Sequence, residues 1–208
     1  MALELKQAIE ELRKQKERKF DQTMDLIVNL RGIDLKKTNI SFVVGVPHRV
    51  KDKKVCGFLN SKSDLLKTIT KPEFASYKEQ KDLRGLVKGF DFFIASASLM
   101  PAVATTFGKA LGPSGKMPSP QLGIIAQETP AEIKNALEKI AKSVKIRLKE
   151  SSIKVAVGKL SMKDEDIIQN INSVYKGIVN ALPTKKENVK NVLLKLSMSK
   201  PVGVSING

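Results

Sequence analysis

The segment "FGKALGPSGKMPSPQLG", residues 107–123, combines glycines, a lysine and prolines in a way that could bind phosphate. A nucleotide-binding Walker A loop requires a glycine, four further residues, and then Gly-Lys followed by Ser or Thr. Here Ala110 stands at the first glycine position, and Met117 stands at the position of the magnesium-binding hydroxyl. Pro113 removes one backbone N–H donor from the loop. We therefore do not expect nucleotide hydrolysis at this segment.

The other potentially reactive side chains also favour structural roles. His48 is the single histidine and Cys56 the single cysteine, so a histidine metal site, a disulfide within the chain and a cysteine metal cluster are excluded. His48 lies in "VPHRV", which predicts a surface or hinge position, and the apolar run around Cys56 predicts burial. Asp164 and Asp166 fall in the first turn of a predicted helix, where carboxylates complement the helix dipole. These side chains therefore do not predict a catalytic site.

Net charge is the most informative property of the sequence. The 208 residues carry a net charge of +16, and the pI is about 9.9. Residues 1–60 contribute +5, residues 61–143 contribute +4, and residues 144–208 contribute +7, so the two ends are about twice as basic per residue as the middle. An excess of this size predicts a polyanionic partner. No stretch approaches the roughly 18–20 apolar residues of a membrane span, so we predict nucleic acid and no membrane partner.

Aromatic content narrows the kind of nucleic acid. Aromatic residues make up 5% of the chain and there is no tryptophan, which disfavours recognition of single strands by base stacking. The glycine-turn-helix signature of a DNA-reading motif is also missing from the sequence. Recognition of folded RNA by shape, phosphate and 2′-hydroxyl contacts is the class that remains.

Both ends of the chain show patterns of a mixed α+β domain. Apolar residues at helical spacing predict an amphipathic helix over residues 3–18. Alternating apolar residues predict a strand from Met24 to Leu30 and a second strand from Ile40 to Val46, ended by Pro47. We expect these two strands to be antiparallel.

The C-terminal part continues in the same style. "VKIRL" and "IKVAV" alternate around "KESS" and predict a β-hairpin. Ser161 followed by Asp164 resembles a capping box at the start of a helix over 164–180. "NVLLKLSM" predicts a final strand. Its apolar residues on one side are Val192, Leu194, Leu196 and Met198.

The middle of the chain has a different pattern. "KVCGFLN" (54–60) and "DFFIASA" (91–97) are continuous apolar runs, typical of strands buried on both faces. Helical patterns lie between and after them, at roughly 63–70, 73–83, 98–111 and 130–142. We therefore predict a two-domain protein. A split α+β domain with an antiparallel sheet comprises residues 1–52 and 144–208, and an inserted α/β domain with a mostly parallel sheet comprises 54–143.

Motifs along the whole chain resemble the large-subunit ribosomal protein family numbered one. Lys19-Phe20 with Thr23 three residues later, in "RKFDQTMDLIVNLRGID", resembles the family's opening, which continues to Leu30, Ile33 and Asp34. Further similarities are "VVGVPH", "FDFFIASASLMP", "LGPSGKMPSP", "VGK" at 157–159, and Ser197-Met198-Ser199-Lys200-Pro201 in place of Thr-Met-Gly-Lys-Pro. The Phe-Phe-Ile-Ala and Gly-Lys-Met-Pro forms resemble archaeal members.

The resemblance implies a specific role. Members of this family are monomers outside the ribosome and bind large-subunit ribosomal RNA at the mobile stalk beside the tRNA exit site. They help to release deacylated tRNA from the exit site and can repress translation of their own messenger RNA. The resemblance also implies a Rossmann-like fold for the inserted domain, a cytoplasmic ribosomal location and no cofactor.

The family's RNA contacts come from two segments of the split domain. Carried over, they predict RNA-binding residues here; these are Lys19, Phe20, Thr23, Ser197, Met198 and Ser199. Ser197 keeps the hydroxyl of the family's threonine, whereas Ser199 replaces a glycine that lets the backbone approach RNA closely. Ser114 replaces an arginine of the family's inserted domain, so any contact made by that arginine should be missing.

Two alternatives stay open at this point. One is a nucleolar-type relative that acts in ribosome assembly, although such relatives usually carry long basic extensions that this sequence does not show. The other is an enzyme or a ligand-binding protein that uses the inserted domain to bind a nucleotide or small metabolite. Such folds bind ligands in a cleft at the carboxyl ends of the strands.

Overall fold

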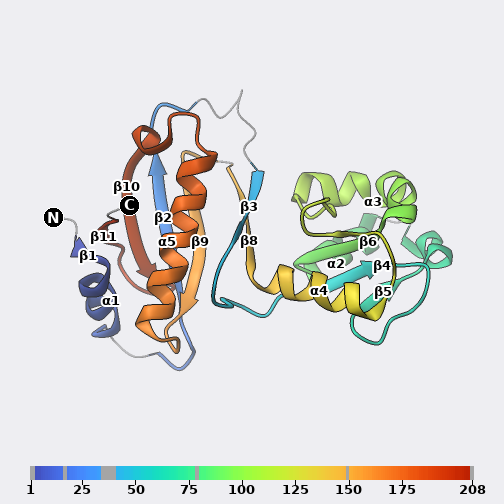
Figure 1. The fold of residues 1–208 in the computed structure, drawn as a ribbon, viewed down its shortest axis with the longest axis horizontal. Coiled ribbons are helices and arrows are strands. Elements are labelled where there is room, and N and C mark those ends of the chain that lie inside the picture. Colours follow the sequence, from blue (N-terminus) through green and yellow to red (C-terminus); the bar gives the residue numbers. More distant parts are fainter. Residues whose placement is uncertain (1–2, 16–17, 34–40, 78–79, 149, 207–208) are drawn as a thin grey trace. The chain divides into compact units, whose positions relative to one another are not determined.

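The computed structural model describes residues 3–15, 18–33, 41–77, 80–148 and 150–206. It divides into two compact units (Figure 1). The terminal unit combines Met1–Lys51 with Lys142–Gly208, and the inserted unit is Asp52–Ala141. The boundaries expected from the sequence lie within two residues of these limits. That each unit is a domain able to fold on its own stays a prediction.

The terminal unit is a mixed α+β structure. In chain order its elements are β1 (Leu3–Glu4), α1 (Leu5–Arg13), β2 (Thr23–Leu30), β3 (Ser41–Gly45), β8 (Ser143–Arg147), β9 (Ser152–Lys159), α5 (Asp164–Ala181), the 3-10 helix η3 (Lys185–Asn188), β10 (Val189–Leu196) and β11 (Val202–Ser205). Five strands form one sheet in the order β1-β11-β10-β2-β9, and β3 pairs with β8 in a separate two-stranded sheet. All pairs are antiparallel except β1 with β11.

Strand β2, which lies between β10 and β9, shows why this sheet has two different faces. Its buried residues alternate strictly from Met24 to Leu30, as the sequence pattern predicts. Those side chains join one hydrophobic core with the apolar faces of α1 and α5, and α5 lies across the sheet (Figure 1). The alternate β2 residues, from Thr23 to Asn29, are half-buried and belong to the opposite face.

Strand pairing in this unit differs from two expectations. β2 does not pair with β3, and β8 and β9 do not form a hairpin with each other. β2 is instead flanked by β10 and β9, both of which are eight residues long like β2 itself. The five-residue strands β3 and β8 pair over their full length. Strands that are far apart in the sequence therefore pair here in place of sequence neighbours. Ile40, which the sequence places at the start of the second strand, lies outside the described residues.

Three further local expectations for the terminal unit are wrong. The first helix ends at Arg13 rather than at residue 18, because the run after Leu12 offers no apolar side chain to bury. Ser161 does not cap α5: Lys163 is the N-cap residue, and the Ser161 hydroxyl donates to Asp21 Oδ2 (2.9 Å). Met198 lies beyond β10, which ends at Leu196, so it does not share the buried side of that strand.

The inserted unit is built on a parallel sheet. Its elements are β4 (Val55–Phe58), β5 (Lys67–Ile69), the 3-10 helix η1 (Lys71–Tyr77), α2 (Gln80–Gly89), β6 (Phe92–Ser96), the 3-10 helix η2 (Ala97–Leu99), α3 (Met100–Ser114), β7 (Ile124–Ile125) and α4 (Pro130–Ala141). The strand order is β5-β4-β6-β7, with every pair parallel. Side chains from the two faces of β4 and β6 enter different cores, one shared with α2 and α3 and the other with α4. The sheet is therefore a middle layer between helices.

Two helices expected in the inserted unit are different in the structure. The segment at 63–70 contains β5 instead, where Thr68 and Ile69 have β-branched side chains that favour a strand beside β4. The segment at 73–83 is divided between η1 and α2. Helices at 98–111 and 130–142 are confirmed as α3 and α4, within two or three residues at their ends.

Candidate nucleic-acid interface

Two segments far apart in sequence meet where β2 begins and β10 ends. Thr23 donates its N–H to Ser197 Oγ (3.3 Å), and the Ser197 N–H donates to the Thr23 carbonyl (3.0 Å). The Ser197 hydroxyl also donates to the same carbonyl (3.3 Å). We call residues 18–23 together with 197–200 the junction. It brings together all six residues that the sequence predicts for RNA binding.

A buried glutamine holds the second segment of the junction in place. Gln22 is only 4% exposed, and its Oε1 accepts a hydrogen bond from the Met198 N–H (3.2 Å). The Gln22 carbonyl accepts from the Leu160 N–H (2.8 Å), which joins a third segment to the junction. Sequence reasoning missed Gln22. The sequence does contain a signal for it: Gln22 is a polar residue two positions before Met24, so it falls on the same side as the buried apolar residues of β2.

The third segment supplies partners for the junction's carboxylate. Asp21 accepts from the Ser161 N–H (3.1 Å) and from its hydroxyl (2.9 Å), and Lys159 Nζ lies 3.7 Å from Asp21 Oδ2. Lys159 is also directly opposite Thr23 in the β2–β9 register. The "VGK" motif was noted in the sequence only as a family similarity, so Lys159 and Ser161 are additions from the structure.

Two large apolar side chains stand out from the junction into solvent. Phe20 is 52% exposed and Met198 is 61% exposed. In the described part of the chain, the only other large hydrophobic residue with such exposure is Leu65, in the inserted unit. Exposed cations flank both segments; they are Arg18, Lys19 and Lys200. Apolar contact area beside positive charge is suited to a nucleic acid, which presents bases and sugars beside phosphates.

Ser199 has a structural part in this arrangement. Its Oγ accepts from the Leu196 N–H (2.8 Å), and its own N–H donates to the Leu196 carbonyl (3.1 Å). These bonds close the turn that ends β10 and turns Met198 outward. Ser199 is not among the described residues with positive φ, so a side chain at this position causes no backbone strain. The replacement of the family's glycine is thus accommodated by the local backbone.

A carboxylate lies next to the junction on the half-buried face of β2. Asp25 is opposite Lys195 of β10 and Ala156 of β9. Burial raises the pKa of Asp25 above its ordinary value, and the charge of Lys195 lowers it only in part. The ionised Asp25 is therefore imperfectly stabilised where it stands.

The two units differ in charge. The terminal unit has 24 Lys and Arg against 12 Asp and Glu, a net charge of +12 over 118 residues, and the inserted unit has +4 over 90. The positive potential that attracts a polyanion is therefore concentrated on the unit that carries the junction.

The glycine-rich segment of the inserted unit has a structural explanation. Gly115 has φ 71° and ends α3 in the left-handed conformation that glycine favours. The Lys116 N–H donates back to the Leu111 carbonyl (3.0 Å), and Lys116 Nζ donates to the carbonyls of Val87 and Phe90 (both 2.7 Å). Lys116 therefore stabilises the end of α2 and is not presented to a phosphate.

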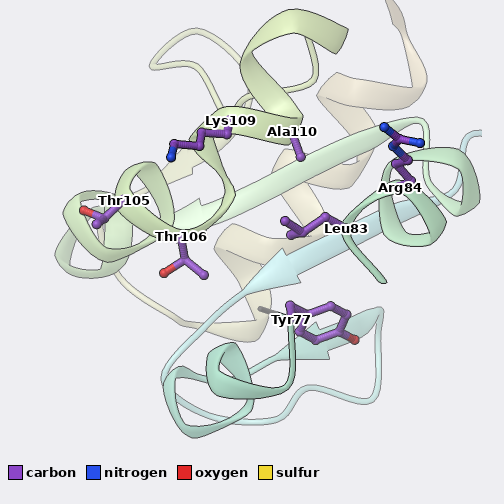
Figure 2. A pocket seen from close by; sticks show the side chains of 7 residues that line it. All are labelled: Tyr77, Leu83, Arg84, Thr105, Thr106, Lys109 and Ala110. Atoms are coloured by element: carbon purple, nitrogen blue, oxygen red, sulfur yellow. The ribbon is translucent and has the colours of Figure 1, made fainter. Parts of the chain in front are cut away.

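A hollow of about 530 Å³ lies between helices of the inserted unit (Figure 2). Its lining comes from η1, α2 and α3; the residues are Tyr77, Leu83, Arg84, Thr105, Thr106, Lys109 and Ala110. Figure 2 shows Lys109 and Arg84 at opposite sides of the view, with Leu83 between them and Tyr77 below. None of these lining residues belongs to a strand or directly follows one, whereas the small-ligand alternative places its cleft at the carboxyl ends of the strands.

The remaining candidate groups do not assemble a reactive site. Among the described residues, no group of three His, Cys, Asp or Glu side chains could hold a metal ion. His48 Nε2 is 2.9 Å from Gln169 Oε1, and the backbone N–H of His48 donates to Oδ1 of the buried Asn170 (3.0 Å). Two residues of α5 therefore hold this segment. Burial raises the pKa of Cys56 to about 12, which keeps its thiol protonated and unreactive. None of the described helices is long and apolar enough to cross a membrane.

Comparisons with known proteins agree with the motifs. Residues 12–200 match the model of the ribosomal protein L1p/L10e family. The "Large ribosomal subunit protein uL1" of Pyrobaculum calidifontis is 33% identical over 211 residues, which cover 96% of this chain and 92% of the relative. The protein of the same name from Pyrococcus abyssi is 34% identical over 202 residues, covering 91% of this chain and 89% of the relative. The chain belongs to the ribosomal protein L1p/L10e family.

Proposed function

We propose that this chain is a cytoplasmic structural protein of the large ribosomal subunit and that it binds large-subunit ribosomal RNA through the junction. The observation that carries the proposal is the pairing of Thr23 with Ser197, which sets the exposed side chains of Phe20 and Met198 on adjoining segments. Family membership and the names of the relatives point to the same role.

Different residues of the junction would have different roles in RNA binding. Hydrogen bonds between Thr23 and Ser197, and between Gln22 and Met198, already hold this surface in place in the free protein, so RNA binding requires little further ordering. The exposed Lys19 and Lys200 provide charge for phosphates. Phe20 and Met198 provide apolar area for a sugar or an unstacked base, which gives shape-dependent contact with folded RNA.

The finer role follows from the resemblance. We propose that the RNA is that of the mobile stalk, that the bound protein helps to release deacylated tRNA from the exit site, and that the same junction binds a similar fold in the chain's own messenger RNA and represses its translation. Outside the ribosome the protein is a monomer. The two RNAs would then share one fold that the same junction binds.

Binding to a transcribed stalk fragment of large-subunit RNA tests the proposal. We expect tight binding whose affinity falls steeply as salt rises from about 50 to 200 mM, because phosphate contacts release counterions. A control RNA of the same length with the stalk fold disrupted should bind far more weakly. Equal affinity for the two RNAs would contradict the proposal. Co-sedimentation with large subunits, followed by crosslinking, would then locate the contact.

A further inference from the structure

The strand order of the inserted unit marks one position as special. From β4 the chain passes to β5 on one side, and then returns to place β6 on the other side of β4, followed by β7. The direction of winding therefore reverses between β4 and β6. Sheets of this kind bind their ligands outside the carboxyl ends of the two strands at such a reversal.

Hydrogen-bond donors converge at this position. Just after the end of β4, Asn60 and Ser61 present two backbone N–H groups, one side-chain amide and one hydroxyl. The last residue of β6, Ser96, is only 3% exposed, and its hydroxyl lies 3.2 Å from that of Ser98. Asn60 Nδ2 also donates to Ser98 Oγ (3.3 Å). We call Asn60, Ser61, Ser96 and Ser98 the donor cluster; donors of this kind suit an oxyanion.

The cluster is already occupied by a carboxylate of the same chain. Glu128 follows β7 by three residues, and its two oxygens accept from the Asn60 N–H (3.0 and 2.9 Å), from Asn60 Nδ2 (2.6 Å) and from the Ser61 N–H (3.3 Å). The Ser61 hydroxyl lies at 3.5 Å. Glu128 thus takes the place in which a doubly wound sheet holds its ligand.

The charge state of Glu128 agrees with an anion held by donors. Partial burial raises its pKa, but the hydrogen bonds from Asn60, Ser96 and Ser61 outweigh burial, so its pKa is lower than the ordinary value. Hydrogen bonds that favour the ionised form act in this direction. The cluster therefore stabilises a negative charge, and Glu128 supplies it near neutral pH.

We propose that the donor cluster at the carboxyl ends of β4 and β6 is an anion-binding site for a small carboxylate or similar oxyanion, closed by Glu128 as its internal ligand. While Glu128 is in place, an external carboxylate or phosphate finds both backbone N–H groups already bonded. The inserted unit thus has donors at the position where such sheets bind ligands, but its own Glu128 side chain occupies them. An anion enters only when the Glu128 carboxylate is removed or displaced.

Rescue of a truncated side chain by acetate tests this site in the full chain. In Glu128→Ala we expect sodium acetate, against sodium chloride of equal ionic strength at pH 7, to shift the amide signals of Asn60 and Ser61 saturably in a ¹⁵N-correlation spectrum. The wild type and the control Glu138→Ala, which removes an exposed carboxylate of α4, should show no such saturable shift. Amide signals that ignore acetate in Glu128→Ala, or that shift equally in the wild type, would overturn the proposal.

A pH titration of the wild type tests the site without depending on the variant's folding. The carboxyl carbon of Glu128 should titrate below the usual glutamate range of about 4.3, and the amide protons of Asn60 and Ser61 should shift with the same midpoint. Amide signals that do not follow the Glu128 midpoint would show that the carboxylate is not their ligand, and the proposal would fail.

Discussion

The junction of the terminal unit and the donor cluster of the inserted unit are both gatherings of polar groups at strand ends, but they differ in what is left for a partner. In the donor cluster the backbone N–H groups of Asn60 and Ser61 are bonded to Glu128 of the same chain. At the junction the internal bonds join Thr23 to Ser197, and the side chains of Phe20 and Met198 point into solvent. The first arrangement is complete in itself, and the second is a fixed frame that presents contact area.

The same distinction applies to the lysines. Lys116 belongs to the motif that most resembles a phosphate loop, yet its ammonium group is bonded to two carbonyls at the end of α2. Lys19 and Lys200 belong to no recognisable nucleotide motif, but they are exposed within the junction. Availability of donors, rather than their residue type, decides which surface can bind an anionic partner.

Removal of an exposed side chain at the junction should have the largest effect. We expect Met198→Ala to weaken binding to the stalk RNA fragment by about 1–3 kcal/mol, or roughly 5- to 150-fold in Kd, and Thr23→Ala to act in the same direction. Filter binding or calorimetry at fixed salt measures the change. Leu65→Ala is the matched control, because it removes an equally unusual exposed apolar side chain from the inserted unit. Normal binding by both junction variants would show that the interface lies elsewhere.

Loss of the internal carboxylate should affect stability and leave RNA binding unchanged. We expect Glu128→Ala to lower the free energy of unfolding by about 1–2 kcal/mol, since it removes charged hydrogen bonds from donors that water can partly satisfy. Urea unfolding gives this value, and the exposed Glu138→Ala variant provides the baseline. A Glu128→Ala protein as stable as the wild type would mean that the donor cluster contributes nothing to the fold.

The lysine of the glycine-rich segment should prove structural. Lys116→Met removes two hydrogen bonds to carbonyls at the end of α2, and we expect a loss of about 1 kcal/mol in the free energy of unfolding. Lys109→Met on α3 is the control, with an expected change within about 0.5 kcal/mol. If Lys116→Met instead weakened RNA binding without any loss of stability, the segment would be part of the interface.

Substitution of Asp25, the carboxylate beside the junction, should have the smallest effect. It should raise the free energy of unfolding, whereas substitution of Glu128 should lower it. Because the folded-state pKa of Asp25 is raised, its contribution to stability is largest at low pH and declines as pH rises from the ordinary value of about 3.9 through the folded value. Asp25→Asn should therefore be slightly more stable than the wild type at pH 7, by less than about 1 kcal/mol. Unfolding at pH 3 and pH 7 checks this; a variant less stable at pH 7 would contradict it.

Local apolar patterns in the sequence predicted strands correctly where the packing of the folded chain buries the same residues. The alternation from Met24 to Leu30 appears unchanged in strand β2, because each buried residue packs into the same core. The continuous apolar runs at 54–60 and 91–97 contain β4 and β6, which helices cover on both faces. Prediction failed where the outcome depends on a distant partner: 63–70 reads as helical, but β4 pairs with it as β5.

The candidate site shows the same limit. The family motifs predict that Lys19 to Thr23 and Ser197 to Ser199 are two segments of one RNA interface. They did not reveal Gln22, Lys159 or Ser161, whose roles come from contacts across more than a hundred residues of chain. Met198 also read as part of a strand face, because the turn that ends β10 is closed by a side-chain hydrogen bond of Ser199.

The sequence by itself determined that this chain is a basic protein of the ribosomal protein L1p/L10e family, because composition and short motifs survive any arrangement of the elements in space. Only the tertiary structure decided which side chains are bound within the chain and which are left exposed for a partner. Glu128 and Lys116 are bound by partners that lie 68 and 29 residues away, whereas the side chains of Phe20 and Met198 remain exposed. Hydrogen bonding and burial depend on neighbours in space, and those neighbours are fixed only when distant strands pair.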